Sequence, residues 1–258
     1  MMNQQTFQTA LRAASIDRRV TYYDTTDSTN TRAIVAAEAG VAGHGDLVIA
    51  GAQTAGRGSD GKAWASAEPV GLWMSIVFCE PLRVTALSVL PAVAVTEVLR
   101  RDYGIAAHVK WPNDVLVGQG EMTRKIAGIL IESCTTPTGR AWVMGIGVNL
   151  RQERFDPSLA PIATSVRILS GRDASIPRFC GALIKAMEEL QSSEVDLSAR
   201  WGELSRMPGR TVTLRRGGSQ CLARVDGVTV DGHLRLTHSD GRQETLIGVA
   251  GVDIDPQY

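Results

Sequence analysis

The chain has 258 residues, of which 44% are apolar, so it can build the core of one large domain with a smaller one beside it. Its 27 lysines and arginines balance its 27 aspartates and glutamates, which gives no net charge at pH 7. A neutral chain has no global attraction to DNA or to an anionic membrane, so we expect neither as a partner.

The cysteines, the histidines and the first residues bear on compartment and on metal binding. The four cysteines lie far apart and contain no C-x-x-C pair, which predicts reduced thiols in a cytoplasmic protein. The histidines form no metal-ligand set with them and are expected at the surface or in turns: His44, His108, His233 and His238. We expect no signal peptide, because no apolar stretch opens the chain. We expect no membrane span, because the longest apolar helix candidate, residues 84–98, is short and contains Pro91.

In chain order, residues 1–19 are polar and predict a short helix or a loose arm, too short for a winged helix-turn-helix domain. Strands are expected around Tyr22 and Tyr23, over 46–50 and over 71–78. A helix is predicted over 31–39, since capping residues precede it and Gly40 ends it. The longest helix is predicted over 84–103, with a kink or a late start at Pro91.

Strand signals resume at 108–110, 115–117, 125–132 and 140–150, with glycine turns typical of antiparallel pairing. Helices are predicted over 176–191 and 197–204. Beyond residues 207–209, short strands at 211–214, 221–225, 233–237 and 244–247 alternate with glycine turns. We therefore predict an α+β fold with three parts: an arm (residues 1–19), a mixed, largely antiparallel sheet packed with helices (20–207) and a small β-barrel (208–258).

The most informative segment is the glycine loop, residues 56–64, which reads GRGSDGKAW. Its three glycines expose backbone N–H groups, Arg57 and Lys62 add positive charge, and Trp64 offers a flat apolar face. Such a loop suits a phosphate or a carboxylate. A Walker A motif is disfavoured, because Ala63 stands where that motif needs a hydroxyl and no helix is expected to follow. The alternative is a plain surface hairpin with a core tryptophan.

Four further clusters contain polar, charged or glycine residues that a helix cap, a turn or a strand alone would not need. Residues 27–30, DSTN, exceed the single residue that a helix N-cap needs, which suggests a helix N-terminus facing a ligand. Residues 110–114, KWPND, form a ligand site or a plain β-turn. Lys125 opens an apolar strand, where it either meets an anionic ligand or ends in solvent. The glycines of residues 145–149, GIGVN, allow close approach to the backbone.

Taken together, and in this order along the chain, these clusters resemble the biotin–protein ligases. The matching blocks are residues 27–30, Gln53 with 56–58, 110–114, 125–130 and 145–149. Each block is weak alone, but five in the family's order make a specific match over roughly residues 20–205. The resemblance implies a biotin/lipoate ligase-like fold and an SH3-like form for the C-terminal barrel.

The resemblance also implies an ATP-dependent reaction in two steps. The biotin carboxylate attacks the α-phosphate of ATP and gives biotinyl-5'-AMP and pyrophosphate. A lysine amine of a biotin carboxyl carrier protein then attacks the mixed anhydride and releases AMP. Mg²⁺ would accompany ATP, because cations and a metal offset the repulsion between the two reacting anions, but the sequence identifies no ligands for it. A homodimer is compatible with the resemblance and is left open.

Carried over position by position, the resemblance assigns a role to each matching residue. The biotin site would consist of Ser28, Thr29, Asn30, Gln53, Arg57, Gly58, Ser59 and Lys125. The nucleotide site would consist of Arg57, Trp64, Asn113 and Asn149. Arg57 and Lys125 would act on the reacting carboxylate and phosphate, and Asp114, helped by Lys110, would orient the incoming lysine.

The chain departs from the family's pattern in three places. The family's loop typically reads Gly-Arg-Gly-Arg-x-Gly-Arg, whereas Ser59 and Lys62 stand at the later arginine positions here, with Asp60 between them. No DNA-binding winged helix, present in some members, is seen. Residues 251–255 lack the arginine often found there.

Two other functions remain open. A lipoate–protein ligase shares the fold and the acyl-adenylate chemistry, although the Gly-Arg-Gly loop, residues 110–114 and a C-terminal barrel favour biotin. A non-catalytic protein that senses biotin or acts as a dimeric scaffold is the second, because the loop is altered. Biotin-dependent pyrophosphate exchange would separate all three.

Overall fold

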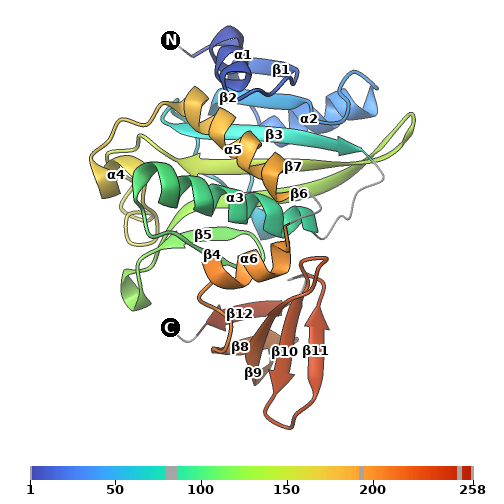
Figure 1. Cartoon of the computed structure of the whole chain (residues 1–258), viewed down its shortest axis with the longest axis vertical. Coiled ribbons are helices and arrows are strands. Elements are labelled where there is room, and N and C mark those ends of the chain that lie inside the picture. Colours follow the sequence, from blue (N-terminus) through green and yellow to red (C-terminus); the bar gives the residue numbers. More distant parts are fainter. Residues whose placement is uncertain (1, 80–85, 192–194, 249–251, 257–258) are drawn as a thin grey trace.

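A seven-stranded mixed sheet forms the body of the molecule in the computed structural model, which describes residues 2–79, 86–191, 195–248 and 252–256 (Figure 1). The strands follow the order β1-β2-β3-β7-β6-β5-β4. Their bounds are β1 Val20–Thr26, β2 Leu47–Gln53, β3 Gly71–Cys79, β4 His108–Lys110, β5 Asp114–Val117, β6 Arg124–Thr136 and β7 Gly139–Asn149. Every neighbouring pair is antiparallel except β1 and β2. The predicted mixed, largely antiparallel sheet is confirmed.

The parallel pair follows from the helix between its strands. Helix α2 (Thr29–Glu38) leaves the end of β1 and returns the chain to the start of β2, so both strands run the same way. Val20 therefore pairs with Leu47, and Thr26 pairs with Gln53. This register brings the start of α2 and the end of β2 to the same end of the sheet.

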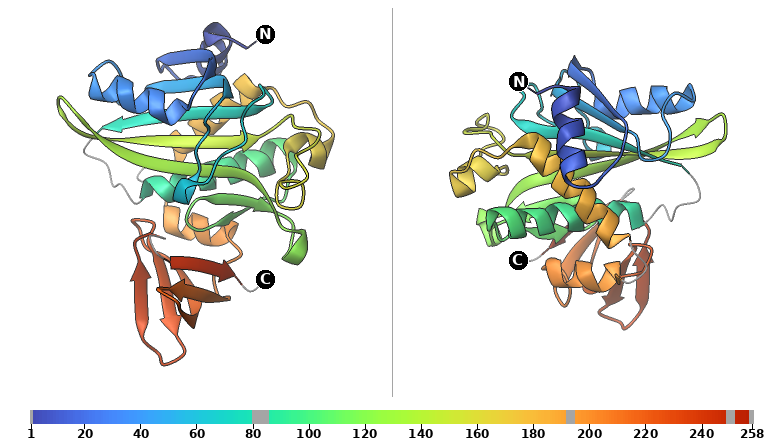
Figure 2. Two further views of the ribbon diagram at one scale, coloured as in Figure 1. Left: turned by 180° about the vertical axis from the view of Figure 1, so that it is seen from behind. Right: turned by 45° about the horizontal axis from the view of Figure 1, so that its top comes forward.

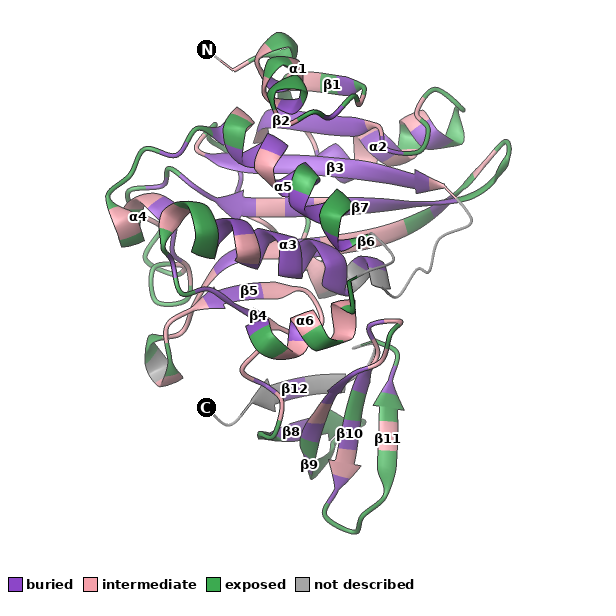
Figure 3. Cartoon of the chain, viewed as in Figure 1, coloured by how far each residue is buried: buried purple, intermediate pink, exposed green. Residues whose placement is uncertain are grey.

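Helices cover both faces of the sheet, and alternate strand residues show which face is which (Figures 2 and 3). Leu47 and Ile49 lie in the large core with α1 (Gln4–Ala13), α3 (Ala86–Tyr103) and α5 (Ile176–Leu190). Val48, between them, packs with Ala33 and Ala37 of α2 in a separate cluster on the opposite face. The face that carries α2 is thus free of α3 and α5 over much of its area.

The helices follow the prediction except at Pro91, where a kink or a late start was expected, and at the short helix α4. Of the two forms predicted for residues 1–19, the helix is the one found, and Phe7 and Leu11 of α1 are buried in the core. Helix α3 runs through Pro91 without a break, and the first two residues predicted for this helix, 84 and 85, lie outside the described part of the chain. Pro91 lies in the second turn, where only one backbone hydrogen bond is lost. The short helix α4 (Val166–Ser170) was not predicted, and α6 (Leu197–Leu204) was.

The C-terminal part is a five-stranded antiparallel sheet below α6 in Figure 1, with the order β11-β10-β9-β8-β12. Its strands are β8 Thr211–Arg216, β9 Ser219–Val228, β10 Leu234–His238, β11 Gln243–Leu246 and β12 Val252–Pro256. Strands β11 and β12 lie at opposite edges, and no pairing joins them among the described residues, so the SH3-like barrel is not confirmed. Trp111 Nε1 donates a hydrogen bond to the Gly232 carbonyl, 2.9 Å away, and so ties this sheet to the main body.

The structure corrects the prediction for two histidines. His108 and His238 are buried, since their elements pack against neighbouring parts of the molecule. His44 is exposed and His233 is half-buried. All four cysteines are free thiols, as predicted. Within the described segments, no three His, Cys, Asp or Glu side chains gather as a metal site requires. None of the helices in these segments has the length and apolarity of a bilayer span.

Candidate active site

A pocket opens on the α2 face of the sheet, between the start of α2, the glycine loop and strands β3, β6 and β7. Its lining contains ten of the thirteen residues that the sequence singled out: Ser28, Thr29, Asn30, Gln53, Arg57, Gly58, Ser59, Trp64, Asn113 and Lys125. Five segments far apart in the sequence therefore meet at one place. The lining also includes Trp73 and Met74 of β3, which the sequence analysis missed because an apolar buried strand gives no sign of a ligand.

Three glycines form the floor of this pocket. A side chain at Gly147 would come within 2.5 Å of Trp64 Nε1, and one at Gly128 within 3.0 Å of Lys125 Nζ. A side chain at Gly145 would overlap the Asn30 amide. The functional side chains thus lie directly on bare backbone, which explains the glycines of residues 145–149 in physical terms.

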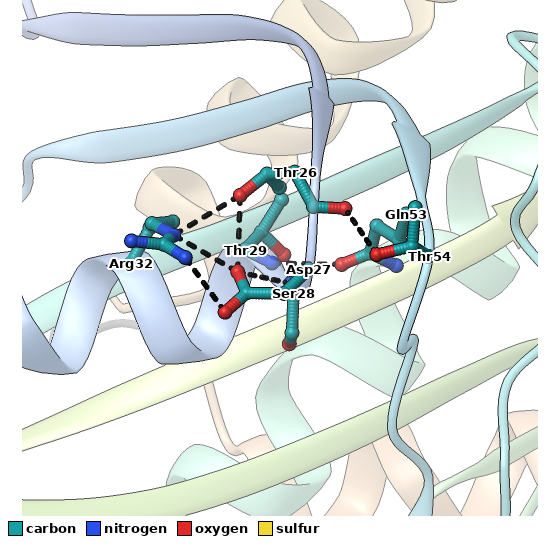
Figure 4. A network of polar contacts seen from close by, with 7 residues as sticks. All are labelled: Thr26, Asp27, Ser28, Thr29, Arg32, Gln53 and Thr54. Carbon is teal, nitrogen blue, oxygen red and sulfur yellow. Dashed lines mark hydrogen bonds and ion pairs between the residues drawn. The ribbon is translucent and has the colours of Figure 1, made fainter.

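The start of α2 presents unused polar groups to the pocket (Figure 4). Ser28 stands at the N-cap position, yet its hydroxyl makes no capping bond. The Thr29 N–H is instead satisfied by Gln53 Oε1, 2.8 Å away at the end of β2. Gln53 Nε2 donates to Ser66 Oγ at 2.9 Å, which leaves its second N–H available. The helix is thus capped from outside, and the Ser28 hydroxyl can serve a ligand.

Asp27, next to the pocket, is held in its charged form. Burial alone would raise the pKa of Asp27, but hydrogen bonds from Arg32, from the Ser28 N–H and from Thr26 lower it, and so does the charge of Arg32. Asp27 Oδ2 lies 2.7 Å from the Arg32 guanidinium. Asp27 therefore supports the turn into α2 rather than acting as an acid or a base.

Lys125 reaches the pocket because strand β6 contains a bulge. Val115 pairs with Ala127 and Leu116 pairs with Lys125, so Ile126 is an extra residue in β6. Ile126 and Ala127 are both buried in the core, and Lys125 returns to the pocket face, where Gly128 also lies. Lys125 Nζ lies 2.5 Å from Asp114 Oδ1 and 5.3 Å from the centre of the Trp64 ring. The segment after β7 fixes its backbone, because the Lys125 N–H donates to the Ile162 carbonyl at 2.7 Å.

Three predicted site residues do not line the pocket. Asp114 reaches it only through Lys125, to which it is paired. Lys110 is half-buried on β4 and pairs with Asp114 across the β4–β5 ladder. Asn149 is buried farther along β7, where its Oδ1 accepts a hydrogen bond from Gln152 Nε2 at 3.0 Å.

Glu132 is a residue at this site that the sequence analysis missed. Its Oε2 lies 2.8 Å from Asn30 Nδ2 and 2.7 Å from an Arg57 guanidinium nitrogen. It therefore joins two of the predicted residues. A glutamate at the end of an apolar strand is ordinary in a sequence, so only the folded structure reveals the contact.

Comparisons with known proteins show the family of this chain. The model of the biotin/lipoate A/B protein ligase family matches residues 22–149. A biotin–[acetyl-CoA-carboxylase] ligase of Paracoccus denitrificans is 32% identical over 234 residues, which cover 84% of this chain and 94% of that protein. The chain belongs to the biotin/lipoate A/B protein ligase family. Its resemblance to the biotin–protein ligases is thereby confirmed.

Two further relatives of this family member define how far the likeness extends. The bifunctional ligase/repressor BirA of Bacillus subtilis is 36% identical over 167 residues, 62% of this chain and 50% of that protein, so the chain spans about half the length of that relative. The structure of the biotin protein ligase of Aquifex aeolicus in complex with biotin and ATP has a TM-score of 0.73 and 21% identity, covering 93% of this chain and 99% of that one. This last likeness shows a shared fold.

Proposed function

We propose that the protein is an ATP-dependent ligase that activates biotin as biotinyl-5'-AMP and transfers it to a lysine of a biotin carboxyl carrier protein. One observation carries the proposal. The pocket gathers two cations, Arg57 and Lys125, beside the polar groups of Ser28 and Gln53 on a floor of glycine. Cations suit a carboxylate and a phosphate, and neutral donors and acceptors suit the ureido ring of biotin.

Biotin would bind with its ring at the start of α2. The Ser28 hydroxyl and the spare N–H of Gln53 are both unengaged and can face the ureido oxygen and nitrogens. Trp73 and Trp64 meet edge to face, with ring centres 6.4 Å apart, and offer an apolar wall to the thioether ring and the chain. The carboxylate would then extend toward Lys125 and the glycine loop.

The first step would depend on how biotin and ATP are positioned and on the positive charges around them, and it would need no general acid or base. The carboxylate attacks the α-phosphate, and pyrophosphate leaves with the electron pair of the broken P–O bond. Lys125 and Arg57 offset the charge that develops on the phosphate oxygens. Both cations are already paired with carboxylates, Lys125 with Asp114 and Arg57 with Glu132, so they are held in place before any anion arrives.

The second step would use Asp114, the carboxylate that is paired with Lys125. When Lys125 turns to the adenylate, Asp114 is left with a free carboxylate oxygen that can hold the incoming lysine amine. Lys110 lies opposite Asp114 in the β4–β5 ladder, consistent with the helping role that the resemblance implies. Trp64, Asn113 and Asn149 would contact the nucleotide.

Mg²⁺ would fit this site only as a companion of ATP. No cluster of three or more His, Cys, Asp or Glu side chains exists in the described segments, and the carboxylates of Asp27, Asp114 and Glu132 are each paired with a cation. Magnesium bound by phosphates and water with few protein ligands is consistent with this donor set. When bound, the ion would neutralise charge on the phosphates.

The acceptor is proposed as a biotin carboxyl carrier protein because relatives of this chain are ligases of acetyl-CoA carboxylase. We also propose that the C-terminal sheet is the SH3-like domain of such ligases. Its antiparallel strands and glycine turns support this form.

The test is to incubate the purified protein with ATP, Mg²⁺, biotin and a carrier domain, and to weigh the carrier by mass spectrometry. We expect one biotin on one lysine, and no product when that lysine is replaced by arginine. Labelling with lipoate but not with biotin would replace this proposal by lipoate ligation. Biotin binding without pyrophosphate exchange would indicate a sensing protein instead.

A further inference from the structure

Ser75 contributes a buried hydroxyl to the otherwise apolar strand β3, beside the start of α2. It is completely buried, and its Oγ lies 2.6 Å from Asn30 Oδ1 and 2.8 Å from Thr29 Oγ1. Thr29 and Asn30 line the pocket, whereas Ser75 does not. A buried hydroxyl costs free energy unless it is hydrogen-bonded, so these two contacts account for its presence in the strand.

The Asn30 amide has a fixed orientation, because its nitrogen meets two oxygens that can only accept. Nδ2 lies 2.8 Å from Glu132 Oε2 and 3.3 Å from the Leu130 carbonyl oxygen. A carbonyl has no proton to give, and neither has a carboxylate that is paired with an arginine, as Glu132 is with Arg57. Asn30 Nδ2 therefore donates to both oxygens, and Asn30 Oδ1 is left as an acceptor.

The direction of the next two hydrogen bonds follows from this orientation. The Ser75 hydroxyl has one proton and two oxygens within reach. Asn30 Oδ1 can only accept, so the Ser75 proton goes to Asn30. In the remaining contact, Thr29 therefore donates and Ser75 accepts. The proton of Thr29 is used inside the protein, and Thr29 Oγ1 offers only lone pairs to the pocket.

A second chain of hydrogen bonds gives Gln53 the opposite role (Figure 4). Gln53 Oε1 accepts from the Thr29 backbone N–H at 2.8 Å, and that group can only donate, so the orientation of the Gln53 amide is fixed too. Gln53 Nε2 donates to Ser66 Oγ at 2.9 Å, and Ser66 Oγ donates to the Trp64 carbonyl at 3.1 Å. One N–H of Gln53 is left over. A ligand in the pocket thus meets an acceptor at Thr29 and a donor at Gln53.

We propose that Ser75 is a positioning residue: together with Asn30 it fixes the proton of Thr29, so that the start of α2 selects a ring that carries an N–H group. A cyclic urea, as in biotin, has an N–H next to a C=O and matches both Thr29 and Gln53. The dithiolane ring of lipoate has neither group and would leave both side chains unpaired. A site with buried polar groups discriminates strongly against a ligand of that kind. The selection of biotin rests on the proposed function, whereas the direction of the hydrogen bonds in the free protein does not.

Calorimetry with biotin and with lipoate tests this selection. Ser75→Ala frees the Thr29 hydroxyl to rotate and removes the donor to Asn30. We expect Ser75→Ala to bind biotin about tenfold more weakly, the scale of one hydrogen bond, and to bind lipoate no more weakly than the natural protein does. Thr96→Val is the control, because Thr96 is another completely buried hydroxyl, on α3, that donates to the Ala92 carbonyl. It should change neither affinity. Equal weakening of both acids by Ser75→Ala, or no weakening, would overturn the inference.

A double variant shows whether Ser75 acts through Thr29. Thr29→Val keeps the shape of the side chain and removes its oxygen, so it should weaken biotin binding at least as much as Ser75→Ala does. Combined with Thr29→Val, Ser75→Ala should weaken biotin binding little further, because the group that it positions is already absent. Two full losses that multiply in the double variant would mean that Ser75 acts independently, against the inference.

Neutron diffraction from a deuterated crystal of the free protein locates the hydroxyl protons directly. We expect the deuterium of Ser75 to point to Asn30 and that of Thr29 to point to Ser75. A Thr29 deuterium that points into the pocket would overturn the inference, whatever acid the protein binds.

These measurements separate the inference from the proposed function. If the natural protein selects biotin as described but forms no adenylate, the proposed function fails and the role of Ser75 stands. If it attaches biotin to the carrier while Ser75→Ala binds both acids unchanged, the role of Ser75 fails alone. Tighter binding of lipoate than of biotin by the natural protein would refute both.

Discussion

Lys125 and Asp114 form an ion pair across the neighbouring strands β6 and β5, with 2.5 Å between Nζ and Oδ1. The pair exists because the bulge at Ile126 turns Lys125 toward the pocket. It keeps the ammonium group in place in the substrate-free protein and keeps a carboxylate near it. Lys125, proposed for the first step, and Asp114, proposed for the second, are thus paired with each other in the substrate-free protein.

Replacing Lys125 tests the first step. We expect Lys125→Ala to lower biotin-dependent pyrophosphate exchange by at least about a hundredfold, the scale of losing one preorganised donor to a developing charge. Folding should be little changed, since Lys125 is partly exposed. Lys185→Ala, at an exposed position on α5, is the matched control and should keep full exchange. Near-normal exchange in Lys125→Ala would show that Lys125 is an ordinary surface lysine.

The altered glycine loop predicts weak retention of the intermediate. Arginine grips a phosphate with two hydrogen bonds, whereas Ser59 cannot and Lys62 acts as a point charge. Asp60 adds a negative charge to the same loop. We expect biotinyl-AMP to escape and to modify exposed lysines of bystander proteins, and Ser59→Arg to slow its release. The check is the dissociation rate of pre-formed biotinyl-AMP after rapid dilution into unlabelled ligand. Equal rates in the two forms would assign retention to other groups, such as Arg57 and Lys125.

The buried His108 predicts how stability depends on pH. Burial, with the charges of Arg206 and Arg100, lowers the pKa of His108 from 6.5 to about 4. As the pH falls below 6.5, His108 becomes protonated in the unfolded chain, whereas in the folded protein it stays neutral down to about pH 4. The unfolded state is therefore favoured, and the free energy of unfolding decreases as the pH falls from 6.5 to about 4. From pH 7 to pH 5 this effect amounts to about 2 kcal/mol. Urea unfolding of the natural protein and of His108→Gln should show a flatter pH dependence in the variant, and parallel curves would refute the assignment.

The balanced charge predicts no specific binding to DNA. The chain carries no net charge, and the only described helix before β1 is α1, which packs into the core against α5. A gel-shift with the promoter region of the biotin genes of its own organism should give no salt-resistant, biotin-dependent complex. Such a complex would reveal a basic surface that the overall charge conceals.

Much of the sheet could be predicted because its strands are unambiguous. Residues 71–78 are apolar except for Ser75, as in a strand buried on both faces, and β3 covers Gly71–Cys79. Helix α6 ends where it was predicted, at Leu204. The parallel pairing of β1 with β2 could not be read from glycine turns, because it depends on how α2 crosses the sheet.

The site could be predicted in its composition but not in its connections. The lining of the pocket contains residues from all five blocks, since each block combines residue types that are unusual for its position. A regular strand would place Lys125 and Gly128, three residues apart, on opposite faces. The bulge that brings them together leaves no mark in the sequence, because Ile126 and Ala127 are both apolar. Glu132 was missed for a similar reason, since its contacts with Asn30 and Arg57 cross long sequence distances.

The glycine floor of the pocket limits how the protein can change in evolution or in the laboratory. At Gly128, Gly145 and Gly147 no atoms remain to be removed, so no substitution there can deepen the pocket. Mutation at these positions can only raise the floor. Variants that accept a bulkier acid must therefore gain space from the walls, at Trp73 or the glycine loop. Any side chain added at these three positions would also push Lys125, Asn30 or Trp64 out of place.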